Sequence, residues 1–169
     1  MSGDPRQGKR PVSAMLAGPY GHPFHPILVT VPIGAWVASF VFDIASHFVD
    51  DPDFLVEGSS WLIAIGVLGA LVAATIGFLD LLAIPTGTPA FRTGLLHMTL
   101  NLLVTVAYAL GFGWRQGADV AVAVPAGPLA LSAAGLMTLA VSGYLGGKLA
   151  YRYGVRVADE TTQAGGFTH

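Results

Sequence analysis

The sequence predicts an all-α fold, namely a four-helix transmembrane bundle with both termini in the cytoplasm. Hydrophobic residues make up 53% of the 169 positions and charged residues only 11%, whereas soluble domains carry about 25% charged residues. The mean hydropathy is +0.65. The few charges gather near the two ends of the chain and in short connections, which leaves long neutral runs between them. This combination is typical of an integral membrane protein.

Four neutral runs are long enough to cross a bilayer as helices. An α-helix needs ~20 residues to span ~30 Å of hydrocarbon, and each run reaches that length. The predicted spans cover residues 26–48, 61–84, 91–114 and 128–151. Segments rich in Pro, Gly and Asp separate the spans and predict the connections between them: DDPD, IPTGTP and VPAGP.

The domain organisation and the orientation follow from these spans. We expect one membrane domain over residues 21–157, a cytoplasmic N-terminal segment over residues 1–20 and a flexible C-terminal tail over residues 158–169. All but one of the Lys and Arg residues fall on the side of the two termini, and Arg115 alone falls on the other. The positive-inside rule therefore predicts cytoplasmic termini in the inner (plasma) membrane of a cell.

Composition and motifs exclude several functions. The chain has no cysteine, so it forms no disulfide, thiolate zinc site or cysteine-ligated iron–sulfur cluster. Its net charge of −2 provides no basic surface for nucleic acid. The sequence also lacks a phosphate-binding Gly-rich loop and the Gly-x-Ser-x-Gly and His-Glu-x-x-His motifs. We therefore do not expect an enzyme that acts on its own.

Five polar residues are predicted to lie at one depth of the membrane. His22 and His25 stand where the first span opens, and Asp80 lies near the end of the second. His97 lies about two turns into the third span, and Asn101, on the next turn, shares its face. Since successive spans alternate in direction, all five come together in the inner leaflet. Ionisable groups at such a depth are costly and usually functional, so we expect a polar pocket between the helices.

The segment HPFHP places a proline after each of two histidines. The residue that precedes a proline avoids the α region, so His22 and His25 are expected in extended backbone. Pro26 is then expected to begin the first helix. The segment would form a short re-entrant cap beneath the bundle, because non-helical backbone at that depth needs the cover of protein or of a wet cavity.

These residue types suit two cofactors. His25 and His97 could ligate a haem b iron from both sides. Alternatively, His22, His25 and His97 could hold a divalent transition metal. In either case Asp80 and Asn101 would lie next to the ligating histidines and help to orient them. A chain of His and Asp side chains could also relay protons.

A purely structural reading of the polar residues stays open beside these. Asp80 could pair with Arg92 across the short connection, and the histidines could hydrogen-bond nearby carbonyls or cap a helix. Toward the outer face, Asp43 could pair with Arg115 or with His47. For Asp43 we favour this pairing over an ion path.

The second and fourth spans suggest how the helices pack and meet lipid. Small residues such as Gly66 and Gly135 recur there at four-residue spacing, which lets helix backbones approach closely in lipid. We favour packing within the bundle over a homodimer seam, although a homo-oligomer stays open. If the last helix continues past Tyr151, Arg152 and Arg156 lie one turn apart, and we expect both to meet anionic lipid head groups.

Three stretches of the chain resemble one bacterial membrane family. The stretches are HPFHPILVTVPIGAW, GFLDLLAIPTGTPAFRTGLLHMTLN and YLGGKLAYRYGVRV. They resemble the domain of unknown function 2231 family over about residues 21–157, and the resemblance implies a four-helix membrane domain. In some relatives such a domain is joined to a Rieske iron–sulfur domain, which implies a redox setting. This chain has no cysteine with which to build that cluster.

The leading hypothesis is a cofactor-binding subunit of membrane redox chemistry, in contact with the lipid bilayer and with a membrane redox partner. The runner-up is a small transporter or proton pathway that uses the same residues and that would need a dimer to form a path. A third hypothesis is a packing subunit of a membrane complex without chemistry of its own. The optical spectrum of the purified protein separates the first hypothesis from the other two.

Overall fold

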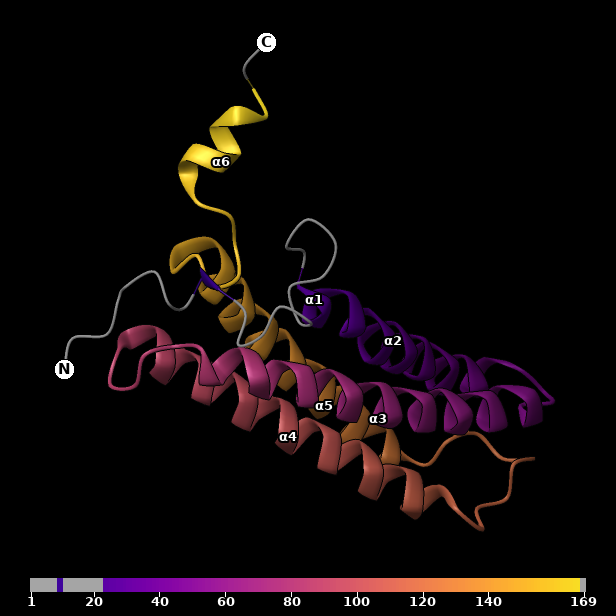
Figure 1. Cartoon of the computed structure of the whole chain (residues 1–169). Helices are drawn as coiled ribbons and strands as arrows, with labels where there is room; N and C mark the ends of the chain where they lie inside the picture. The colour runs from indigo at the N-terminus through magenta and orange to yellow at the C-terminus, as the bar shows by residue number, and fades with distance from the viewer. Residues whose placement is uncertain (1–8, 11–22, 168–169) are drawn as a thin grey trace.

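The structure, a computed structural model, describes residues 9–10 and 23–167 (Figure 1). Its regular elements are helices, and the described part of the chain contains no β-strand. Four helices are long and apolar enough to cross a membrane. They cover Phe24–Phe48, Asp53–Leu82, Pro89–Arg115 and Ala126–Arg152. The predicted all-α class with four membrane-length helices is therefore confirmed.

The four spans divide into shorter elements at their ends. The first span is one short and one long helix in series, joined without a break because Val29 N–H donates to the His25 carbonyl at 3.1 Å. The fourth span ends in a π-helical turn, and one short helix follows it. In chain order the elements are α1 (Phe24–Leu28), α2 (Thr30–Ala45), a 3₁₀ turn (Ser46–Phe48), α3 (Asp53–Leu82), α4 (Pro89–Arg115), α5 (Ala126–Gly147), the π-helical turn (Lys148–Arg152) and α6 (Glu160–Gly165).

The starts of α3 and α4 follow from helix-end chemistry. α3 begins at Asp53, well before the predicted Trp61, because an acidic residue in the first turn favours a helix N-terminus. α4 begins at Pro89, whose missing N–H is not needed at a first helical position. The Thr88 hydroxyl accepts a hydrogen bond from Phe91 N–H at 3.1 Å and caps this end.

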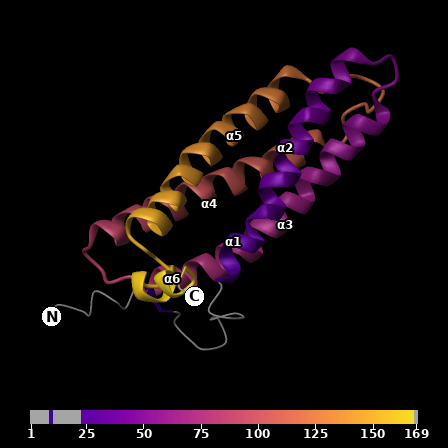
Figure 2. The ribbon, with the colours of Figure 1, turned by 90° about the horizontal axis from the view of Figure 1, so that it is seen from above.

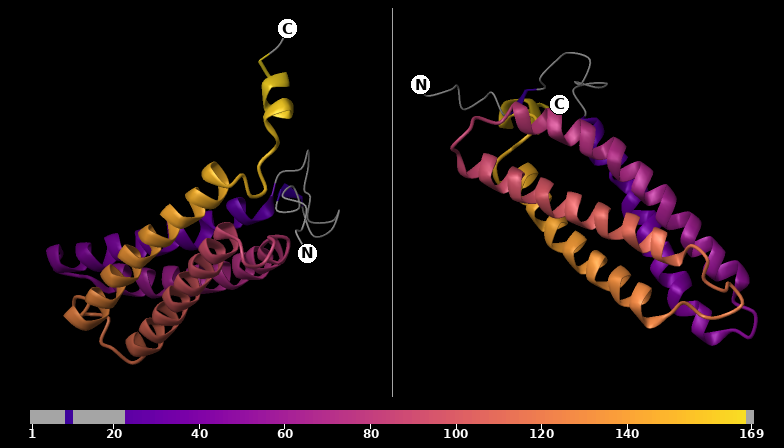
Figure 3. Two further views of the ribbon diagram at one scale, coloured as in Figure 1. Left: turned by 90° about the vertical axis from the view of Figure 1, so that its left-hand side faces the viewer. Right: turned by 90° about the horizontal axis from the view of Figure 1, so that it is seen from below.

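Neighbours in sequence are neighbours in the bundle. α2 lies along α3, α3 along α4 and α4 along α5, while α1 packs on α3 and α2 also reaches α5 (Figures 2 and 3). Large apolar side chains point outward from the helices, among them Leu68, Leu110 and Met137, which are 66–67% exposed. Such a surface suits lipid, whose tails are as apolar as leucine.

The centre of the bundle holds a stacked aromatic pair. The rings of Trp36 (α2) and Tyr108 (α4) lie 4.2 Å apart between centroids and are nearly parallel, at 5°. Both are almost fully buried, together with Ile63 of α3. Gly66 and Gly135 make room for the pair, because a Cβ on Gly135 would lie 2.8 Å from the Tyr108 ring and one on Gly66 would overlap Trp36. The small residues predicted to mediate close packing therefore do so within one chain at these positions.

The histidine-proline segment differs from its predicted backbone. His25 lies in the first turn of α1 and is helical, so the predicted extended conformation at His25 and the helix start at Pro26 are wrong. The extended residue is Pro23, with φ −69° and ψ 138°. A proline is tolerated in the first helical turn, where the N–H groups have no partner within the helix, and this permits Pro26 inside α1. His22 and the rest of the predicted re-entrant cap lie outside the described residues.

Candidate functional site

Four of the predicted site residues lie at one end of the bundle, where α1 begins, α3 ends and α4 begins. We call His25, Asp80, His97 and Asn101 the histidine cluster. His25 comes from α1, Asp80 from the last turn of α3, and the other two from α4. His22, the fifth predicted residue, lies outside the described residues. Within the cluster, the two imidazoles lie near each other and Asn101 contacts His97 directly.

The imidazoles of His25 and His97 face each other across the bundle. Their centroids lie 6.2 Å apart with an angle of 84° between the ring planes. His25 Nδ1 donates a hydrogen bond to the Ala73 carbonyl of α3 at 3.0 Å. His97 Nδ1 donates one to the Ser142 carbonyl of α5 at 2.8 Å. Since a carbonyl only accepts, Nδ1 carries the proton in both rings, and each Nε2 keeps a lone pair.

Glycines hold both rings against a neighbouring helix. A Cβ on Gly77 of α3 would lie 2.8 Å from His25 Cε1, and one on Gly146 of α5 would lie 3.1 Å from His97 Cε1. At Gly77 such a Cβ would force a shift of one group, and at Gly146 the ring would have to move by a few tenths of an ångström. Each imidazole is thus held by a hydrogen bond to a carbonyl and by packing against the backbone at a glycine.

Asn101 contacts His97 as predicted. Its Nδ2 donates to the His97 carbonyl at 2.9 Å and lies 3.2 Å from His97 Nε2. The Ser142 hydroxyl adds a bond to the His97 carbonyl at 3.2 Å. Because neutral Nε2 is an acceptor, the Asn101 amide occupies the lone pair that a metal would otherwise take.

Asp80 has a partner that sequence reasoning did not identify. Its Oδ1 lies 3.1 Å from Nε of Arg156, with both side chains mostly buried. Arg156 therefore does not follow Arg152 along a continuous helix toward the head groups, and Asp80 does not pair with Arg92. The chain turns back after the π-helical turn through Gly154 (φ 65°) and Arg156 (φ 58°). That left-handed turn was not predicted, although the Gly at position 154 was a signal for it.

The histidine cluster is a pair of imidazoles with supporting groups. Among the described residues, no three His, Cys, Asp or Glu side chains gather closely enough to hold a metal ion. The predicted three-histidine site would need His22, which lies outside this part of the chain. The described geometry thus offers two nitrogen ligands from opposite sides of the bundle.

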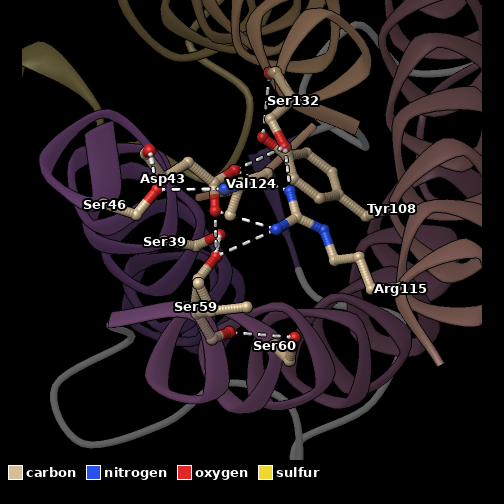
Figure 4. A network of polar contacts seen from close by, with 10 residues as sticks. Ser39, Asp43, Ser46, Ser59, Ser60, Tyr108, Arg115, Val124 and Ser132 are labelled. Carbon is tan, nitrogen blue, oxygen red and sulfur yellow. Dashed lines mark hydrogen bonds and ion pairs between the residues drawn. The ribbon is translucent and has the colours of Figure 1, made fainter. Parts of the chain in front are cut away.

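A second polar group lies near the other end and joins all four long helices (Figure 4). Asp43 of α2 is fully buried, and its two carboxylate oxygens receive Arg115 NH1 at 2.8 Å and NH2 at 2.6 Å. The Ser59 hydroxyl of α3 donates to Asp43 Oδ1. Arg115 NH2 donates to the Ser132 hydroxyl of α5 at 3.2 Å. We call these four residues the Asp43–Arg115 network.

The network confirms the Asp43–Arg115 pairing that the sequence suggested. Sequence reasoning did not identify Ser59 and Ser132 as partners. Ser39 lies one turn before Asp43, and its hydroxyl lies 3.0 Å from that of Ser59. A buried pair is tolerated only where hydrogen bonds satisfy the remaining lone pairs and protons. The serines supply such bonds to the carboxylate and to the two terminal nitrogens, whereas Arg115 Nε is buried without a hydrogen-bond partner among the described residues. The network thus forms a polar link between the helices.

Comparisons with known proteins agree with the membrane fold. A family model described as predicted membrane protein (DUF2231) matches residues 21–159. No curated protein and no solved structure matches the chain. The matched range contains all four spans, the histidine cluster and the Asp43–Arg115 network. The chain therefore belongs to the DUF2231 family of predicted membrane proteins.

Proposed function

We propose that the protein is a haem b-binding subunit of membrane redox chemistry, in which His25 and His97 would hold the haem iron. The observation that carries the proposal is the imidazole pair, whose centroids lie 6.2 Å apart. Each ring has its Nδ1 on a backbone carbonyl, so each keeps the Nε2 lone pair that would bind the iron.

The hydrogen bonds of the two rings support the same role. Metal-ligating histidines almost always donate the other ring N–H to a carbonyl or carboxylate, which fixes the tautomer and the ring orientation. His25 and His97 both do so, toward the carbonyls of Ala73 and Ser142. Asn101 would give up its contact with His97 Nε2 and keep its bond to the His97 carbonyl.

Haem suits the described residues better than a divalent ion does. Two imidazoles complete the axial ligation of a haem iron, whereas protein sites for zinc and related ions use three or four side chains. We assign Asn101 a supporting role beside His97. Asp80, whose carboxylate is engaged by Arg156, would hold the end of the bundle closed behind His25.

The test is the optical spectrum of the protein produced in cells supplied with haem precursor and purified in mild detergent. The proposal predicts a Soret band, a sharp α band in the spectrum of the reduced protein, and about one haem per chain. His25→Ala and His97→Ala should each lose most of the haem. His47→Ala is the matched control, because His47 is exposed and lies at the other end of the first span.

Three results would count against the proposal. A colourless wild-type protein after haem supply, with reconstitution by added hemin also failing, would remove haem as the ligand. Stoichiometric zinc, copper or iron without porphyrin, lost in the two histidine variants, would replace haem by a divalent metal. Equal haem loss in His47→Ala would show that the spectrum reports folding rather than ligation.

A further inference from the structure

The burial pattern of the chain repeats. Asp43 and Arg115 are 72 residues apart, and the same spacing links each buried residue of α2, except Ala35, to a buried residue of α4. A second constant spacing, that of Gly66 to Gly135, links every buried residue of α5 to a buried residue of α3. The pairs are Pro32 and Val104, Trp36 and Tyr108, Ser39 and Gly111, Asp43 and Arg115, then Ser59 and Pro128, Ile63 and Ser132, Gly66 and Gly135, Ala73 and Ser142.

The chemistry repeats with the burial. His25 and His97 share the spacing of Asp43 and Arg115, and so do the two stacked aromatic residues Trp36 and Tyr108. Any two parallel helices that pack together pair their residues at a constant spacing in the sequence, so the spacing alone does not show a repeat. Parallel packing does not, however, place the same rare residue type, histidine, at matched positions, nor an aromatic residue at both members of a second pair.

Contacts inside each half of the bundle match as well. His25 Nδ1 donates to the carbonyl of Ala73, and His97 Nδ1 donates to that of Ser142, its counterpart. Gly77 has no side chain and so lets the His25 ring lie against the backbone of α3. Its counterpart Gly146 lets the His97 ring lie against the backbone of α5 in the same way.

The aromatic positions follow the same rule. A Cβ on Gly66 would overlap Trp36, and one on its counterpart Gly135 would lie 2.8 Å from Tyr108. The helix pair α1–α2 with α3 therefore has the internal contacts of the pair α4 with α5.

Counterpart residues also meet each other between the halves. The ring centroids of His25 and His97 lie 6.2 Å apart, and those of Trp36 and Tyr108 lie 4.2 Å apart. The carboxylate of Asp43 lies 2.6 Å from the guanidinium of its counterpart, Arg115. A residue on a two-fold axis meets its own equivalent, so these three pairs mark an axis that runs along the bundle.

We propose that the membrane domain is a tandem duplication of one two-span unit, and that its ligand site lies on the pseudo-two-fold axis between the halves. Both units enter the membrane from the same side, so the axis lies along the membrane normal, as in other parallel repeats. In this assignment His25 and His97 are equivalent ligands. Asp43 and Arg115 occupy one further equivalent position, where the halves have diverged into opposite charges that bind each other.

The duplication specifies the ligand class of the proposed function, and this part rests on that function. A site that takes the same group from each half suits a ligand with two equivalent faces. A metalloporphyrin has two such faces, one for each axial nitrogen.

The first test compares matched glycine variants by NMR of protein labelled with ¹⁵N-histidine, kept under reductant in detergent. Gly77→Ala should shift the His25 ring signals more than those of His97, and Gly146→Ala should shift the His97 ring signals more than those of His25. Gly143→Ala is the control in α5, because a Cβ there meets nothing within 4 Å. A larger effect on the same ring from both glycine variants, or no effect from one of them, would overturn the equivalence.

A second variant keeps the proposal testable if the alanine variants do not fold. Each single change, Asp43→Arg or Arg115→Asp, should lower the melting temperature, and the swap of both should recover part of that loss, because the two charged positions are equivalent and the ion pair is restored. A swap as unstable as the single changes would overturn the duplication. Haem content, measured separately, distinguishes the two ideas: equivalent halves without haem leave the duplication standing, and haem with unequal halves leaves the proposed function standing.

Discussion

At the scale of residues, polar side chains inside the bundle are placed where partners meet them. Arg115 binds Asp43 with both terminal nitrogens, and the Tyr108 hydroxyl donates to the Ser132 carbonyl at 3.1 Å. A buried polar group without a partner costs ~1–3 kcal/mol. These contacts therefore remove a cost that a membrane interior would otherwise impose, and they fix the register of the helices against one another.

The Asp43–Arg115 pair should show strong non-additivity. Arg115→Leu leaves the Asp43 carboxylate buried without its counter-charge and should lower the free energy of unfolding by about 3–5 kcal/mol. The double variant Asp43→Leu with Arg115→Leu removes both charges and should cost much less. Unfolding in detergent of the wild type, both single variants and the double variant measures the coupling. Additive losses would show that the two charges act independently.

At the scale of elements, the end of the fourth span is tied back to α3. The π-helical turn Lys148–Arg152 ends α5, and Gly154 and Arg156 then adopt positive φ. This reversal brings the Arg156 side chain to Asp80. The left-handed conformation costs a residue other than glycine about 1–2 kcal/mol, so the ion pair is formed against local backbone preference.

Two substitutions at Arg156 should separate the contribution of the ion pair to stability from the cost of the left-handed backbone. Arg156→Ala loses the ion pair and keeps a side chain in the unfavourable left-handed conformation. Arg156→Gly also loses the ion pair, but glycine adopts that conformation without the steric cost. Thermal unfolding should therefore find the glycine variant more stable than the alanine variant by about 1 kcal/mol. Equal stability, or a more stable alanine variant, would mean that the turn does not hold position 156 in the left-handed region.

At the scale of the whole molecule, charge predicts the orientation of the bundle. Arg92, Lys148 and Arg152 lie at the end that carries the histidine cluster, whereas Arg115 at the other end is neutralised by Asp43. The positive-inside rule then predicts that the histidine cluster lies in the inner leaflet. A reporter fused after His169 should be active in the cytoplasm, and a tag beside Asp53 should be labelled from outside. Reversed labelling would contradict this orientation.

The sequence was a good guide to the parts of the fold that depend on composition. The spans follow from the length of the apolar runs. The partner of Asp43 could be predicted because Arg115 is the one Lys or Arg residue predicted at the same end of the spans as Asp43. The partner of Asp80 could not be read, since it depends on a chain reversal that only Gly154 signals. The backbone of His25 was also misjudged, because the proline rule is weaker in the first turn of a helix.

The central claim, that His25 and His97 both ligate one haem iron, is tested most directly by the electron paramagnetic resonance spectrum of the ferric protein. The wild type should give a low-spin spectrum, because two strong-field imidazoles bind the iron. His97→Ala should turn any retained haem high-spin, free imidazole should restore the low-spin signal, and His47→Ala should match the wild type. A low-spin spectrum unchanged in both His25→Ala and His97→Ala would contradict the claim.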